Sequence, residues 1–251
     1  MKRIRRLDLR THVTAHVTEL LLEAEPGSRL PTEGELSRQL GVSRSTVREA
    51  IRMLALLGVI SVRHGEGLYA GDLKHGTFTL LTEMAIVFRH PTFQEVVEAR
   101  RMIEVDTAAL AAARRYDEDL RTLREIMHRM ARHLDNPRRA SIADLEFHIA
   151  LAQASHNGVL VYLINTMRGL LGLWVHKAFS DRRIEIPEIV REHNAVLAAV
   201  EEGDSKAASD LMGRHIDEAS RRLFRVIAPN EPLSRYARSL LLSRDGLVEE
   251  D

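Results

Sequence analysis

The chain has 251 residues, of which 45% are hydrophobic and 29% are charged, a composition typical of a folded protein rather than a disordered one. Thirty-six basic and thirty-six acidic residues cancel, so any surface that attracts nucleic acid must be local. The absence of cysteine excludes disulfides, thiolate metal sites and cysteine nucleophiles. Because the sequence shows neither a signal core nor an apolar run of roughly 18 residues, we expect a cytoplasmic protein with no membrane partner.

The first seventy residues form short elements with frequent breaks. Apolar residues recur at helical spacing over 8–25, and "EPGSRLPTE" then ends the pattern. A second helix is predicted between the N-cap Thr32 and Gly41, and a third between the N-cap Ser43 and Gly58. The stretches "VISV" and "GLYA", joined by "RHGE", predict a β-hairpin.

Three helices and a hairpin are the layout of a winged helix-turn-helix, which we place at residues 1–72. Between Arg38 and Arg63 there are five arginines and a single acid, Glu49, so this local surface is positive although the chain is neutral. Arginine suits guanine, while serine and threonine reach phosphates or base edges. The alternative is a small packing domain with solvated arginines. The residues expected to contact DNA are Arg38, Ser43, Arg44, Ser45, Thr46, Arg48, His64 and Gly65.

A linker is expected at residues 73–76, and residues 77–228 then have helical periodicity throughout. The breaks in this region predict six or seven helices, which would form an all-helical antiparallel bundle. The fold class is therefore mainly α. Residues 229–251 are a C-terminal tail that is either a short extra helix or disordered. The predicted breaks lie near Pro91, Asp117, Asn136–Pro137, Asn157–Gly158, 180–187 and Gly203–Asp204.

The stretch "DLEFHIAL" places a carboxylate, Asp144, and an imidazole, His148, four residues apart on one helix face. His193 and His215 lie in two further segments with apolar helical faces. One carboxylate and three imidazoles could form a mixed nitrogen and oxygen site for a divalent metal ion. On spacing alone an acid–base pair or a satisfied polar contact stays open, because a buried histidine is more often structural than a ligand.

The segment "LPTEGELSRQLGVSRSTVREAIRMLALLGVISVRHGEGLYA" resembles the DNA-binding domain of the GntR superfamily of bacterial transcription regulators. This resemblance implies that Arg44 and Arg48 read bases and that His64 with Gly65 forms the wing at the minor groove. One departure is Gly34, at or beside a position where the family often carries a basic residue.

Four later segments resemble the FCD effector domain of the FadR subfamily: "VVEARRMIEVDTAALAA", "DLEFHIALAQASHNGVL", "EHNAVLAAVEEGD" and "AASDLMGRHIDEA". The resemblance implies an all-helical effector-binding and dimerisation domain. It also implies a divalent metal, zinc foremost with nickel, iron or manganese as alternatives, and its ligands would be Asp144, His148, His193 and His215.

By the same resemblance Arg100, in the "R..IE" pattern that ends at Glu104, would point into a cavity and pair with an organic acid. The alternative is a surface arginine paired with Glu104. Asn165 and Arg168 are added as effector contacts because they are polar residues within an apolar helix.

The sequence therefore predicts a ligand-responsive DNA-binding transcription regulator, a repressor by resemblance, and not an enzyme. It would sense a small organic acid through a metal-containing helical cavity. A homodimer would bind a palindromic operator in double-stranded DNA. Two alternatives stay open: an architectural DNA-binding dimer with a structural metal, and a metal-dependent hydrolase, although a motif such as H-E-x-x-H is missing.

Overall fold

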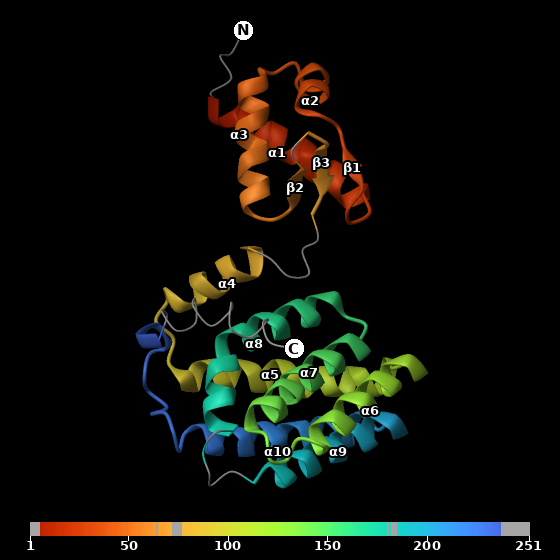
Figure 1. The fold of residues 1–251 in the computed structure, drawn as a ribbon, viewed down its shortest axis with the longest axis vertical. Helices are drawn as coiled ribbons and strands as arrows, with labels where there is room; N and C mark the ends of the chain where they lie inside the picture. The colour runs from red at the N-terminus through yellow and green to blue at the C-terminus, as the bar shows by residue number, and fades with distance from the viewer. Residues whose placement is uncertain (1–5, 64, 72–76, 180, 182–184, 237–251) are drawn as a thin grey trace. The chain divides into compact units, whose positions relative to one another are not determined.

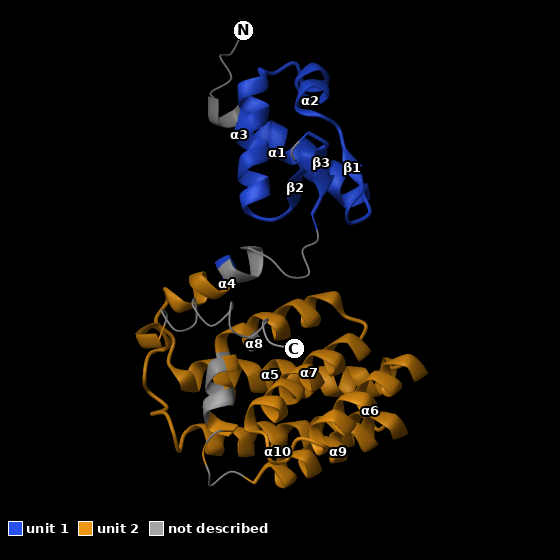
Figure 2. Ribbon diagram, in the orientation of Figure 1, with its two compact units in different colours: residues 1–82 blue, residues 83–251 orange. Residues whose placement is uncertain are grey.

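A computed structural model describes residues 6–63, 65–71, 77–179, 181 and 185–236. The chain divides into two compact units, residues 1–82 and 83–251, shown in blue and orange in Figure 2. The division falls within helix α4 (Thr77–Val87), a few residues after the expected linker. That linker, 73–76, and the wing residue His64 lie outside the described residues.

The N-terminal unit contains three helices and a small antiparallel sheet in the order β1-β3-β2 (Figure 1). The hairpin was predicted, whereas the two-residue strand that pairs with it was not. Val13, Leu36 and Ile51 lie in its buried core. The elements are α1 (Arg6–Glu23), β1 (Arg29–Leu30), α2 (Glu33–Leu40), α3 (Arg44–Leu56), β2 (Ile60–Arg63) and β3 (Gly67–Ala70).

The helix ends in this unit lie where the sequence predicts them. The Thr32 side chain accepts a hydrogen bond from the Glu35 amide, and the Glu35 carboxylate accepts one from the Thr32 amide. Gly41 ends α2 with a φ of 63°, a left-handed conformation that glycine adopts without the steric cost of a Cβ. The Ser43 hydroxyl caps α3 by accepting from the Thr46 amide. These caps fix the tight turn that joins α2 to α3.

The C-terminal unit is a helical bundle, as predicted, and its helices change at the predicted breaks. Helix α5 packs against α7 and α10, and α6 packs against α7 and α9. None of the described helices is both long and apolar enough to cross a membrane. The helices after α4 are α5 (Phe93–Arg114), α6 (Asp117–Ala131), α7 (Pro137–Ala154), α8 (Gly158–Phe179), α9 (Ile186–Glu202) and α10 (Ser205–Leu223).

The first part of the expected tail belongs to this bundle. A short 3-10 helix, Leu233–Tyr236, follows α10, and the side chain of Leu233 is fully buried. The Leu233 amide donates to the Pro91 carbonyl at 2.8 Å, and the Phe93 amide donates to the Glu231 carbonyl at 3.2 Å. Residues 229–236 are therefore ordered against the start of α5, and 237–251 lie outside the described residues.

Candidate metal centre and DNA-binding surface

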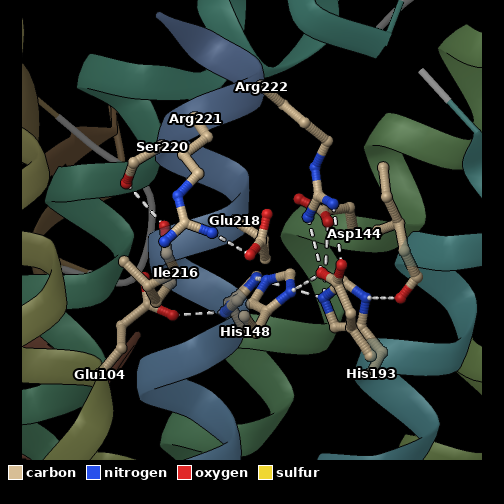
Figure 3. A network of polar contacts seen from close by, with 12 residues as sticks. Glu104, Asp144, His148, His193, Ile216, Glu218, Ser220, Arg221 and Arg222 are labelled. Atoms are coloured by element: carbon tan, nitrogen blue, oxygen red, sulfur yellow. Dashed lines mark hydrogen bonds and ion pairs between the residues drawn. The ribbon is translucent and has the colours of Figure 1, made fainter. Parts of the chain in front are cut away.

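Four buried side chains from three helices meet in the interior of the bundle (Figure 3). Helix α7 supplies Asp144 and His148, whose spacing of four residues places them on one face. Helix α9 supplies His193 and α10 supplies His215. One ligand atom from each residue lies within 4.8 Å of all the others. The structure therefore brings together the four predicted ligands.

The outer ring nitrogen, Nδ1, of each histidine has a partner. Nδ1 of His193 donates to the Ile189 carbonyl at 2.9 Å, and Nδ1 of His215 donates to the Glu192 carboxylate at 2.8 Å. Nδ1 of His148 makes an ion-pair contact with the Glu104 carboxylate. In a neutral histidine, an Nδ1 proton directed at one of these oxygens leaves the lone pair on Nε2.

The three Nε2 atoms face one another. Nε2 of His148 lies 3.3 Å from Nε2 of His193 and 3.3 Å from Nε2 of His215. Nε2 of His193 lies 3.4 Å from Oδ1 of Asp144. Converging lone pairs and a carboxylate repel one another unless a cation lies between them. The donor set, three neutral imidazoles and one carboxylate, fits zinc or a similar divalent transition metal.

Burial keeps two of these histidines neutral near pH 7. It lowers the pKa of His193 to about 3, and the neighbouring His148 lowers it further. Burial likewise lowers the pKa of His215 to about 3, with a further contribution from His193. Since a histidine must be neutral at the nitrogen that binds a metal, both side chains are ready to act as ligands at physiological pH.

The metal-free protein is expected to lose stability as the pH falls from 6.5, the ordinary pKa of histidine, towards about 3. In that window the unfolded chain binds protons on His193 and His215 and the folded chain does not, so acidification favours unfolding. Thermal unfolding of chelator-treated protein across this pH range measures the effect. A His193→Gln/His215→Gln variant should show a flatter pH dependence, and an equally steep one would contradict the assignment.

Arg100 lies beside the candidate ligands and is buried, so it is not a surface residue, although it does pair with Glu104 as the alternative expected. Its Nε donates to the Glu104 carboxylate at 2.5 Å, and its Nη2 donates to Nε2 of His148 at 3.0 Å. A metal bound at His148 would take this Nε2 lone pair and replace the second hydrogen bond. Burial raises the pKa of Glu104, but Arg100 and His148 together outweigh it and hold that pKa below its ordinary value. The neighbouring Arg101 is exposed and pairs with Asp217, as expected of a surface residue.

Two contacts around the ligands were not predicted from the sequence. The Glu192 carboxylate, which accepts from His215, also accepts from both Nη atoms of Arg222 at 2.8 and 2.6 Å. Glu104 was predicted only as a partner of Arg100, yet it also contacts His148. Glu192 directly precedes a candidate ligand, but only the packing of α9 on α10 reveals what its side chain holds.

A pocket opens beside the candidate ligands Asp144 and His215. Its apolar lining includes Val97, Phe179 and Leu223, and its polar lining is formed by Arg100, Asp144, His215, Ser220 and Arg222. Such a mixture suits a small polar ligand that is held at a few fixed points.

The other two expected effector contacts are not placed in this pocket. Asn165 is not among the described residues that line it, and its amide donates to the Val161 carbonyl of its own helix at 2.9 Å. The side chain of Arg168 lies outside the described part of the chain. A role for either residue in effector binding stays a prediction.

Five of the eight expected DNA contacts lie at the start of α3, namely Ser43, Arg44, Ser45, Thr46 and Arg48, but several side chains already have partners. The Ser43 hydroxyl lies 2.8 Å from the hydroxyls of both Ser45 and Thr46. Nε of Arg48 donates to the Glu33 carboxylate at 3.0 Å, and Nε of Arg38 donates to the Gly34 carbonyl at 3.4 Å.

Arg44 is exposed at the first position of α3. At the wing, Gly65 has a φ of 77°, which glycine tolerates. The individual DNA contacts stay predictions.

A winged helix-turn-helix unit followed by a helical unit with a buried polar centre defines a class of DNA-binding proteins with a separate helical domain. Residues 9–69 match the model for "Bacterial regulatory proteins, gntR family", and residues 95–218 match the model for the "FCD domain". The matches correspond to the two units of the structure.

Relatives of known description agree with these matches. The chain is 31% identical to the Uxu operon transcriptional regulator of Escherichia coli (strain K12), covering 84% of this chain and 85% of that protein. It is 33% identical to a protein of the same organism provisionally described as an L-lactate dehydrogenase operon regulator, covering 90% and 88%. A solved structure of Streptococcus agalactiae GntR is 29% identical, with a TM-score of 0.68, covering 84% and 99%. The chain belongs to the GntR family of transcription regulators and carries an FCD domain.

Proposed function

We propose that this regulator senses a small organic acid in the pocket beside a bound divalent metal ion, and that the acid changes its affinity for operator DNA. The observation that carries the proposal is that Arg100, Asp144 and His215 line the same pocket. A guanidinium and a metal site in one pocket form a carboxylate-binding surface. One relative is named for an L-lactate dehydrogenase operon, and lactate is a small organic acid with one carboxylate.

The bound metal would be held by Asp144, His148, His193 and His215 and would supply positive charge to a carboxylate oxygen. With the His148 lone pair on the metal, Arg100 would hold the acid through its Nη donors, while its Nε stays with Glu104. Glu104 and Glu192 would orient the ligand histidines through their Nδ1 atoms. The apolar lining would exclude water and strengthen these charged contacts.

The acid would act by binding one arrangement of the regulator better than another, because a ligand shifts an equilibrium only through differential affinity. As in other helix-turn-helix proteins, we propose a homodimer on a palindromic operator. If binding of the acid releases the protein from DNA, the protein is a repressor, as the family resemblance implies.

The test is a thermal-shift screen of sugar acids, hydroxy acids and dicarboxylates, with and without a chelator, followed by operator binding with the acids that bind. Arg100→Gln should abolish the shift caused by the acid, and Arg101→Gln, the exposed neighbour, should keep it. An acid that binds equally to the chelated protein would overturn the role of the metal. If no small molecule alters operator affinity, an architectural protein with a structural metal is the better description.

Arg48→Ala is expected to weaken specific DNA binding by about 1–3 kcal/mol, the range for losing one bidentate base contact. Its metal content should not change, because Arg48 lies in the other unit from the candidate ligands. Titrations of operator DNA at fixed salt concentration measure the loss. Arg121→Ala, on the exposed face of α6, serves as a control for the loss of one positive charge. Equal affinity losses in both variants would argue against base reading by Arg48.

A further inference from the structure

The charges around the pocket are nearly balanced before any ligand enters. Among the described side chains that line the pocket or pair with its lining, two are cationic, Arg100 and Arg222, and three are carboxylates, Asp144, Glu104 and Glu192. A histidine that binds a metal is neutral, so the ligand histidines add no charge to the metal-loaded site. The described groups therefore leave one net negative charge, and a bound divalent metal would change it to one net positive charge.

The Arg222 guanidinium faces the pocket with its charge already compensated. Both of its Nη atoms donate to Glu192, and its side chain is only 12% exposed. A guanidinium has five N–H donors, so three remain after these two hydrogen bonds. They can donate to a hydroxyl oxygen. A second carboxylate, however, would have to compete with Glu192 for the same fork.

Ser220 offers a complementary contact on the same helix. Its hydroxyl proton is donated to the Ile216 carbonyl at 2.6 Å, which leaves the oxygen lone pairs as acceptors. The part of the pocket around Ser220 and Arg222 therefore presents both an acceptor and donors, and it lacks an uncompensated cation among the described residues. This pattern matches the hydroxyl groups of a ligand better than a second anionic group.

We infer that the metal-loaded pocket selects organic acids with one carboxylate and an uncharged, hydroxyl-bearing remainder, and that the Glu192–Arg222 pair sets this preference. The inference rests on the proposed function and names the effector class for that site. The first carboxylate cancels the single net positive charge. A second carboxylate would be desolvated against Glu192 and Asp144, and the described side chains of the pocket offer no free cation to balance it, which is unfavourable in a partly buried site.

Two matched pairs of acids test the preference with metal-loaded protein. D-gluconate and D-glucarate differ only in whether the far end is a hydroxymethyl or a carboxylate, and D-glycerate and tartronate differ in the same way. Isothermal titration should give binding at least about tenfold tighter for the monocarboxylate of a pair that binds. Equal or tighter binding of the dicarboxylate would overturn the inference while supporting the proposed function. Absence of binding by every acid in the wider screen would instead overturn the proposed function.

Variants of the pair separate a charge effect from a structural one. Glu192→Gln removes one negative charge and should shift the ratio of the two affinities towards the dicarboxylate. Arg222→Gln should shift the ratio further towards the monocarboxylate. The double variant Glu192→Gln/Arg222→Gln should return the ratio towards its wild-type value.

Metal content is measured in every variant because Glu192 also holds His215. Glu188→Gln, on the exposed part of α9, is the control. If Glu192 had only a structural role, Glu192→Gln would weaken the binding of both acids equally. An unchanged ratio of the two affinities in this variant would therefore refute the charge assignment.

Discussion

A His193→Ala variant is expected to bind its divalent metal at least about a hundredfold more weakly than the wild-type protein. Structural zinc sites with four ligands bind with about 10–16 kcal/mol, so one ligand of four contributes on the order of 3 kcal/mol. His193 is fully buried, and its Nε2 lies 3.3 Å from Nε2 of His148 and 3.4 Å from the Asp144 carboxylate. Metal content after dialysis against a competing chelator measures the loss.

Two further variants make this result specific. His193→Gln preserves most of the side-chain volume, so it separates the loss of a ligand from the cavity that alanine creates. His128→Ala removes an exposed histidine from α6 and should leave metal affinity unchanged. Both His193 variants should still bind DNA non-specifically, because the N-terminal unit has its own core. Wild-type metal affinity in His193→Gln would mean that the four residues do not form the metal site.

Much of the fold can be read from local signals. The boundaries of α2 and α3 follow from Thr32, Gly41 and Ser43, since capping hydroxyls and a left-handed glycine act within one turn of chain. Strand β1 cannot be predicted from such local signals. Its two residues, Arg29 and Leu30, carry no alternation and are defined only by pairing with β3, forty residues later in the chain. The order of 229–236 also depends on distant backbone partners, at the start of α5.

In the candidate site, too, some features follow from local spacing and others depend on how distant helices pack. The shared face of Asp144 and His148 follows from helical spacing, whereas spacing left the convergence of His193 and His215 with them as one of several alternatives, and the family resemblance favoured it. Burial of Arg100 could not be decided from the sequence, because a pair with Glu104 four residues later is equally typical of a surface helix. The contacts of Glu192 depend on how α9 packs against α10, which spacing along one helix cannot predict.

A Glu104→Gln variant is expected to destabilise the metal-free helical unit by about 3–5 kcal/mol, the range for removing one partner of a buried ion pair. The Glu104 side chain is 4% exposed and contacts both Arg100 and His148. Glutamine would leave the Arg100 guanidinium buried without a carboxylate at its Nε. Denaturant unfolding of chelated protein measures the change, and Glu98→Gln, exposed on the same helix, should stay within about 0.5 kcal/mol of wild type.

A double variant and the pH dependence identify the buried charge as the cause. Arg100→Gln/Glu104→Gln removes both charges and should recover part of the stability that Glu104→Gln loses. The folded pKa of Glu104 lies below its unfolded value, so its contribution is present above the ordinary pKa of glutamate and disappears as the pH falls through the folded pKa. The stability difference between wild type and Glu104→Gln should therefore shrink on acidification. A difference that is independent of pH would indicate lost packing rather than a lost charge.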